Sequence, residues 1–309
     1  MFIFPTLQFF HLLNFFIGVF FGLFLPICYQ KLKEDRDSDS ISHVGYLNII
    51  IGIGLALGQY ISGFFGGFKF IDGWKIAYLL VGLLMITSSA ISLAFSDFSG
   101  RIKSSNVWKH KFQLKSKFYK YLLIQYIPGS IPWGAINVFF FHYVQSSTTL
   151  TKIDSINIII FIGIGMVLGA FFASIILDKV SSDKMIFYII QISFILSQFF
   201  CIIIFYYLEK LEILYIFLLV FFSGIVLAFP GIYIKGILFK YLDSEETKFI
   251  FSFENFLESL GKGLGPLIIG WIIFQTENLF ISLLFSTLFW NLSMLFIFLA
   301  FRYSPQNEI

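Results

Sequence analysis

Residues 252–271 read SFENFLESLGKGLGPLIIGW, and this stretch decides the fold of the chain. It is mostly apolar, and as a helix rising about 1.5 Å per residue it is long enough to cross the roughly 30 Å hydrocarbon core of a bilayer. Glu254, Glu258 and Lys262 stand at intervals of four, which places them on one face of a helix. Charges inside a membrane segment are costly, so this face is expected to point at protein or at a water-filled cavity where the charges pair.

The second half of the stretch favours close contact and bending. Gly261, Gly263 and Gly265 let a neighbouring helix approach, and Pro266 removes one backbone hydrogen bond. A charged face and a Gly-Pro hinge in one segment indicate a protein that moves, not a passive anchor.

The composition of the whole chain supports the same class. Of its 309 residues, 58% are hydrophobic and 13% are charged, whereas a soluble globule of this size needs more charged surface. The sequence therefore predicts an all-α, multi-pass integral membrane protein, with the lipid bilayer as a partner. The net charge of +3 lies mostly in connecting segments and does not indicate a nucleic acid partner. Cys28 and Cys201 fall in apolar stretches without a metal or redox motif, so we expect no metal and no cofactor.

Nine apolar stretches have the length of a membrane span. They cover residues 8–30, 44–66, 74–96, 118–145, 154–177, 184–207, 212–240, 250–274 and 279–302. A long basic loop leaves three of them before it and six after it. The predicted organisation is a partial N-terminal half at 1–96, a basic linker at 97–117, a six-helix C-terminal half at 118–302 and a tail at 303–309.

Basic residues predict the orientation of the chain in the membrane. One side collects fifteen of the 21 Lys and Arg residues, counting Lys120, and the other side collects four. The basic side consists of the C-terminal tail and the loops 31–43, 97–117, 178–184 and 240–248. Because short loops rich in Lys and Arg stay in the cytoplasm, we expect a cytoplasmic C-terminus and, with nine spans, Met1 on the outside.

The second and third predicted spans carry the first sign of a family. Gly54, Gly58 and Gly63 form a glycine-rich face in the second span, and Gly73-Trp74-Lys75 opens the third. This order, followed by a basic central loop, resembles the fifth and sixth helices of the major facilitator superfamily. The resemblance implies that the glycine-rich helix packs tightly against the partner half of the protein.

The fourth predicted span carries Pro132-Trp133-Gly134 at its middle. Pro132 is expected to kink the helix, while Trp133 and Asn137 lie four residues apart and share a face. A PWG sequence in the first helix of the second half resembles the Spinster-like branch of that superfamily. Trp133 and Asn137 are then either part of a cavity wall that bends during transport, or a packed tryptophan beside an asparagine bonded across helices.

The fifth predicted span ends in Asp178 and Lys179. With Ser174 and Ser181 in place of two glycines, this end resembles a degraded form of the superfamily's loop motif. In the family this loop makes charge contacts between helices, so the resemblance implies a structural role for Asp178 and Lys179. The alternative is a solvated pair of charges.

The closest resemblance covers the seventh and eighth predicted spans. Pro230 is followed by Lys235, and Glu254 and Glu258 precede the sequence GKGLGP at 261–266. This order is similar to the tenth and eleventh helices of the Spinster-like branch. The resemblance spans residues 8–302 as the last nine of twelve helices, which implies that the first three are lacking.

The resemblance implies a secondary transporter that works by alternating access and is not an enzyme. Its substrate would be a small organic solute or a lipid-like amphiphile. Glu258 and Lys262 form either a structural pair or a gate or proton-linked site, and Lys235 is expected to extend to the lipid headgroups. The alternative is a degenerate or truncated facilitator without transport activity. The sequence contains neither a nucleotide-binding loop nor a repeated pore loop, which argues against a pump and a channel.

Overall fold

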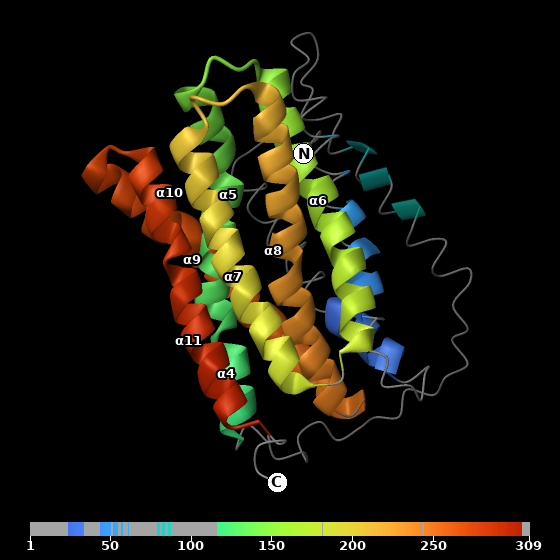
Figure 1. Cartoon of the computed structure of the whole chain (residues 1–309). Coiled ribbons are helices and arrows are strands. Elements are labelled where there is room, and N and C mark those ends of the chain that lie inside the picture. The colour runs from blue at the N-terminus through green and yellow to red at the C-terminus, as the bar shows by residue number, and fades with distance from the viewer. Residues whose placement is uncertain are drawn as a thin grey trace, which may run out of the picture.

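The computed structural model describes residues 24–33, 44–50, 52–54, 57, 61, 79–80, 82–83, 86–87, 116–180, 182–242 and 244–304. These residues are helical or lie in short connections, and they include no strand (Figure 1). Most of the three predicted spans before residue 97, including Gly58 and Gly63, lie outside the described residues. The count of nine spans therefore stays a prediction.

From residue 116 onward the helices follow one another with short connections. They are α4 (Lys117–Ile124), α5 (Tyr126–Ser147), α6 (Lys152–Lys179), α7 (Asp183–Tyr207), α8 (Ile213–Tyr241), α9 (Ser244–Thr276), α10 (Leu279–Thr287) and α11 (Phe289–Arg302). Among the described residues, five segments are long and apolar enough to cross a membrane: Ile153–Leu177, Asp183–Tyr207, Ile213–Tyr241, Glu246–Thr276 and Leu279–Arg302. Several such helices in one chain indicate a multi-pass integral membrane protein.

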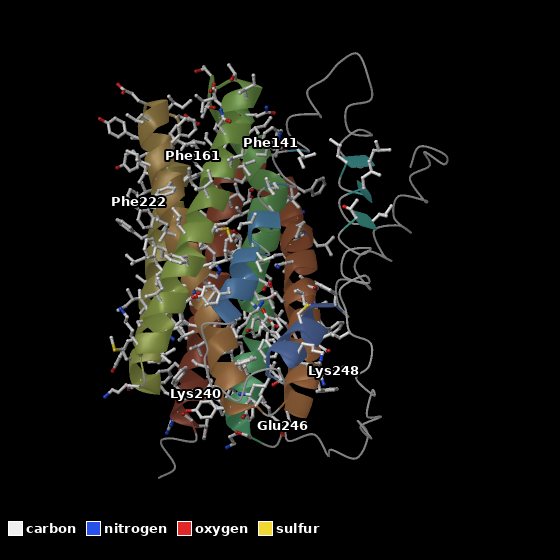
Figure 2. All side chains as sticks on the ribbon, turned by 90° about the vertical axis from the view of Figure 1, so that its right-hand side faces the viewer. Phe141, Phe161, Phe222, Lys240, Glu246 and Lys248 are labelled. Carbon is white, nitrogen blue, oxygen red and sulfur yellow. The ribbon has the colours of Figure 1, made fainter. Side chains whose placement is uncertain are left out.

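The outer surface of the bundle is apolar along its length and charged at its ends. Phe222 is 51% exposed and Phe161 is 37% exposed, and both lie away from the charged end in Figure 2. Lys240, Glu246 and Lys248 all lie at that end (Figure 2). We call this end of the bundle basal and the opposite end apical. An apolar middle between charged ends matches the hydrocarbon core and the headgroup regions of a bilayer.

The fourth predicted span is interrupted at Gln125, between α4 and α5. Pro128 has no N–H to donate to the carbonyl of Ile124, and a proline ring crowds the carbonyl four residues before it. The Gln125 side chain accepts a hydrogen bond from Ser293 Oγ of α11 at 2.8 Å. α5 continues through Pro132, so the kink expected at that residue stays a prediction.

The last predicted span is also two helices, α10 and α11, although no proline separates them. Ser286 Oγ donates to the carbonyl of Leu283 at 2.6 Å, and Thr287 Oγ1 donates to that of Leu284 at 2.8 Å. Hydroxyl groups that bond carbonyls of the preceding turn compete with the helix ladder and bend it. The two consecutive hydroxyls account for the break at this place.

The packing of the helices from α5 to α11 follows one pattern twice. In this pattern α10 and α11 count as one broken span. The most extensive contacts join α5 with α9 and α6 with α8, while α7 packs on α8 and the α10–α11 pair packs on α5. Exchanging α5, α6 and α7 with α8, α9 and α10–α11 converts each of these pairs into another observed pair. Equivalent helices run in opposite directions, because two helices lie between them along the chain and successive helices alternate in direction. The smaller α5–α6 and α9–α10 contacts have no such counterpart.

Glycines bring the backbones of α6 and α8 together. A Cβ atom on Gly165 would stand 2.2 Å from the carbonyl oxygen of Phe221, and one on Gly169 would stand 2.2 Å from that of Ile225. From the other side, a Cβ atom on Gly224 of α8 would stand 2.3 Å from a carbonyl oxygen of α6. Small residues at four-residue spacing allow this close approach of two membrane helices.

The α5–α9 pair uses the same device. A Cβ atom on Gly261 would stand 2.4 Å from the carbonyl oxygen of Ile127, and one on Gly265 would stand 2.3 Å from that of Ile131. From the other side, a Cβ atom on Gly134 of α5 would stand 2.0 Å from a carbonyl oxygen of α9. Two glycines four residues apart on one helix and one glycine on its partner thus occur in both exchanged pairs.

The described N-terminal fragments contact α6, α8 and α9, and two of these contacts involve Gly45 and Lys33. A Cβ atom on Gly45 would overlap Ser174 Oγ of α6, which is buried and donates to the carbonyl of Ala170 at 2.6 Å. Lys33 Nζ donates to the carbonyl of Phe239 at 3.1 Å and lies 4.7 Å from the centre of that ring. These contacts place the fragments against α6 and against the basal part of α8.

Candidate functional site

Four charged side chains form a row across α8 and α9. We call Lys235, Glu254, Glu258 and Lys262 the charged cluster. Lys235 Nζ lies 3.5 Å from Glu254 Oε1 and 3.3 Å from Glu258 Oε2. Lys262 Nζ lies 2.6 Å from Glu258 Oε1. The signs of the charges alternate along the row, and Glu258 contacts both lysines.

Helix geometry and helix packing contribute separately to this row. The Glu258–Lys262 pair was predicted from its four-residue spacing, and the structure confirms the contact. Lys235 comes from α8, which makes few backbone contacts with α9. The expectation that Lys235 extends to the lipid headgroups is wrong, because its ammonium group contacts two glutamates and its side chain is 13% exposed.

Burial increases along the row from Lys262 to Glu254. The exposed fraction of the side chain is 46% for Lys262, 20% for Glu258 and 2% for Glu254. Within the described part of the chain, Glu254 Oε1 has the ion contact with Lys235 but no hydrogen bond. A buried carboxyl group that shares one cation with a second carboxyl group is poorly compensated. Glu254 is therefore the most deeply buried charge of the cluster and Lys262 the most accessible one.

Two tyrosines lie at the buried end of the charged cluster. Tyr29 stacks on Phe251 with ring centres 4.2 Å apart, and its hydroxyl accepts a hydrogen bond from Asn48 at 3.4 Å. The Tyr126 hydroxyl is buried and has no hydrogen-bond partner among the described residues. Both rings lie within electrostatic range of Glu254 and its lysine partner. Two aromatic rings therefore lie near Glu254, at the buried end of the charged cluster.

Tyr29 and Tyr126 were not among the predicted site residues. The chain has 15 Tyr and 44 Phe, so a single aromatic residue in a span carries little signal. The only sequence signal for Tyr29 and Tyr126 was the hydroxyl group that each carries in an apolar stretch. A buried hydroxyl needs a hydrogen-bond partner, so such a tyrosine is a candidate for a polar site. Which tyrosines meet the charges depends on how distant segments pack.

Trp133 and Asn137 lie on α5, beside the charged cluster. The close contact of Gly134 with the backbone of Lys262 brings the two helices together at this level. Trp133 is half-buried and Asn137 is exposed. Among the described residues, no hydrogen bond joins either side chain to the cluster. The structure thus assembles the three charged candidates of α9 and leaves Trp133 and Asn137 on the neighbouring helix.

The remaining packing and hinge candidates differ in their surroundings. A Cβ atom on Gly54 or Gly263 would have no described neighbour within 4 Å, so neither glycine makes a close helix contact in the described part of the chain. Pro266 lies inside α9, which continues through it. The close contact in this region is made by the glycines on either side of Gly263.

The predicted loop charges Asp178 and Lys179 are the last two residues of α6, not part of a loop. Lys179 is exposed, and the side chain of Asp178 lies outside the described residues. A charge contact between helices at this end is made by Asp183, which is 3% exposed at the start of α7. Lys240 Nζ lies 3.0 Å from Asp183 Oδ1, and the Tyr241 hydroxyl donates to Asp183 Oδ2. We call these three residues the basal clasp.

No protein-family model matches this chain, and no curated protein is detectably similar to it. The chemistry that the charged cluster supports therefore rests on its geometry. Alternating charges in a row can exchange partners without leaving a charge unpaired. Because Glu258 contacts two lysines, it can release one of them and keep the other.

Proposed function

We propose that this chain is a secondary transporter of the major facilitator type, similar to the Spinster-like branch, which works by alternating access. Its substrate is a small organic solute or a lipid-like amphiphile. The charged cluster belongs to its central site or gate. The observation that carries the proposal is the exchanged packing of the helices between α5 and α11.

The exchanged packing supports a transporter because it is the arrangement of an inverted repeat. In the major facilitator superfamily each six-helix half contains two three-helix units of opposite direction, and the substrate site lies near the middle of the membrane. The same exchange relates the glycine contacts of the α5–α9 pair to those of the α6–α8 pair. Two backbone contacts of one kind at equivalent places favour a duplicated unit over an arbitrary helix bundle.

The position of the charged cluster also supports this proposal. Lys262 stands fourteen residues before Thr276, the last residue of the 33-residue helix α9, which is about 21 Å along the helix axis. That depth lies well inside a hydrocarbon core of about 30 Å. Ionisable groups at such depth commonly mark a substrate or ion pathway.

The basal end is proposed to face the cytoplasm. Its described helix ends carry the basic residues Lys117, Lys120, Lys179, Lys184, Lys240, Lys248 and Arg302. The same end also carries the acidic residues Asp178, Asp183 and Glu246. At the apical end, Lys152 and Lys210 are accompanied by the acidic residues Asp154, Glu209, Glu212 and Glu277. Because Lys and Arg gather on the cytoplasmic side of membrane proteins, this distribution supports a cytoplasmic C-terminus.

Accessibility of Asn137 from the two sides of the membrane tests alternating access without knowledge of the substrate. The full chain, with Cys28 and Cys201 replaced by serine and alanine, would carry the single substitution Asn137→Cys. Right-side-out and inside-out vesicles would be treated with a membrane-impermeant maleimide. Matched variants at the two ends, Ser146→Cys and Lys248→Cys, report the apical and the basal side.

We expect Asn137→Cys to react from both sides, because an exposed mid-helix position of a carrier opens to each side in turn. Each end variant should react from one side only, and the two should react from opposite sides. Reaction of Asn137→Cys from a single side, or from neither, while both end variants react as expected, contradicts alternating access. That result would favour the degenerate facilitator without transport activity.

A further inference from the structure

Lys262 combines a position inside the membrane segment with an accessible ammonium group. Its side chain is 46% exposed, although α9 extends more than three turns beyond it in each direction. A lysine ammonium offers three hydrogen-bond donors, and within the described part of the chain one of them contacts Glu258. Donors left without a partner at this depth are costly, so water or an anion must meet them.

Glu258, the partner of Lys262, also contacts a second cation, so its charge does not need Lys262 for compensation. Glu258 Oε1 accepts from Lys262, while Glu258 Oε2 lies 3.3 Å from Lys235. If Lys262 turns away, the Glu258 carboxylate keeps a cation in contact. Lys235, in contrast, cannot leave without depriving the buried Glu254 of the one cation that contacts it among the described residues. Lys262 is therefore the lysine of the cluster that can bind another anion at the lower cost.

Space beside Lys262 is indicated by an independent observation. A Cβ atom on Gly263 would have no neighbour within 4 Å among the residues that the structure describes, whereas those on Gly261 and Gly265 would overlap the backbone of α5. The α9 backbone is thus packed on one side and open at the residue that follows Lys262. Tyr29 and Tyr126 lie at the other end of the cluster, near Glu254.

We infer that Lys262 binds the negatively charged group of a ligand, a carboxylate or a phosphate, in place of Glu258. Lys235 retains Glu258 and Glu254 during this exchange. The inference rests on the proposed function, because it names the chemical class of the substrate that the charged cluster would recognise. A lysine acts as a point charge toward either group, so a free anion and an anionic head group of an amphiphile share this chemistry.

The test is a binding measurement on the purified full chain in phosphatidylcholine nanodiscs. Radiolabelled dodecanoate serves as the probe in a scintillation proximity assay. Unlabelled competitors with the same twelve-carbon tail are dodecyl phosphate, dodecylphosphocholine and dodecyltrimethylammonium. Acetate and inorganic phosphate, which lack the tail, distinguish a free anion from an anionic head group.

The variants are Lys262→Gln, Lys262→Arg and, as a matched control on the same helix, Lys248→Gln. We expect dodecanoate to bind about tenfold more weakly or worse to Lys262→Gln, the effect of losing one charge-assisted hydrogen bond. Lys262→Arg and Lys248→Gln should bind within about twofold of the unaltered chain. Dodecyl phosphate should compete, and dodecyltrimethylammonium should not.

Four results would overturn the inference. They are absence of saturable dodecanoate binding, unchanged binding by Lys262→Gln, equal loss in Lys248→Gln, and equal competition by the cationic amphiphile. If Lys262→Gln does not fold, the head-group selectivity of the unaltered chain and the behaviour of Lys262→Arg decide. Because this assay requires no transport, it can fail while Asn137→Cys still reacts from both sides, and it can succeed while that reaction fails.

Discussion

The contact between Gly134 and α9 gives the sharpest prediction for stability. A Cβ atom at residue 134 would stand 2.0 Å from the carbonyl oxygen of Lys262, 2.7 Å from its carbonyl carbon and 2.8 Å from its Cα. Ordinary contact begins at 3.4 Å, so the shortest of these distances is about 1.4 Å too short. The atoms belong to backbone and cannot turn away as a side chain would. In Gly134→Ala the two helices must separate or shift.

The expected cost follows from two opposing terms. Forcing an extra methyl group into a packed interior costs about 1–3 kcal/mol, and a rigid backbone neighbour places this case near the upper value. Alanine is favoured over glycine inside a helix by about 1 kcal/mol. The net loss in the free energy of unfolding is therefore about 2 kcal/mol. Gly263→Ala has the same gain without the overlap, so it should stabilise by up to about 1 kcal/mol.

The measurement compares the two variants with the unaltered full chain in one detergent. Thermal unfolding is followed by the loss of helical circular dichroism at a fixed scan rate, because membrane proteins of this size commonly unfold irreversibly. A loss of about 2 kcal/mol should lower the apparent Tm of Gly134→Ala by several degrees. Gly263→Ala should show an equal or higher Tm.

Two outcomes would refute the reasoning. Equal Tm values for Gly134→Ala and Gly263→Ala would mean that the close α5–α9 contact does not exist in the protein. A larger loss in Gly263→Ala than in Gly134→Ala would mean that α9 presents a different face to α5. A crosslink between residues 127 and 261, each replaced by cysteine, would then show which helix faces meet.

Three further predictions concern single side chains, each measured by thermal unfolding unless stated. Lys235→Met should destabilise by about 3–5 kcal/mol because it leaves the buried Glu254 carboxylate without its cation, and the double variant with Glu254→Gln should recover part of this loss; simple additivity would contradict the contact between Lys235 and Glu254. Asp183→Asn should cost about 1–3 kcal/mol through the loss of the ion pair in the basal clasp, and a change below about 0.5 kcal/mol would show that the clasp is not formed. Pro128→Ala should straighten the α4–α5 junction, which spin labels at residues 117 and 146 would report as a longer distance; Pro132→Ala should leave that distance nearly unchanged, and the opposite ranking would place the bend at Pro132.

Local sequence patterns determined the features that depend on one helix at a time. Apolar stretches of about 20 residues predict membrane helices because hydrocarbon leaves no other partner for backbone groups. The Glu258–Lys262 contact follows from the geometry of any α-helix, in which residues four apart are neighbours. For the same reason the sequence placed the charges of α9 on one face.

Breaks within spans were harder to place from sequence. The predicted kink was assigned to Pro132, whereas the interruption at Gln125 follows from Pro128, which acts on the carbonyl of a residue four positions earlier. The bend between α10 and α11 depends on two hydroxyl groups that can bond either to the helix or to water. Whether the hydroxyls of Ser286 and Thr287 bond a helix carbonyl or water depends on their burial, which the local sequence does not determine.

Tertiary structure decided which helices meet and which charges they bring together. Lys235 and Glu254 are nineteen residues apart on helices that make few backbone contacts, so no periodicity relates them. The direction in which each glycine of α9 faces decides whether it contacts α5. Gly261 and Gly265 face α5 and contact its backbone, whereas Gly263 faces away from it. The stretch 252–271 thus determined a charged helix by its own composition, but only the packing of α5 and α8 around it made Glu254 the closed end of the charged cluster and Lys262 the open one.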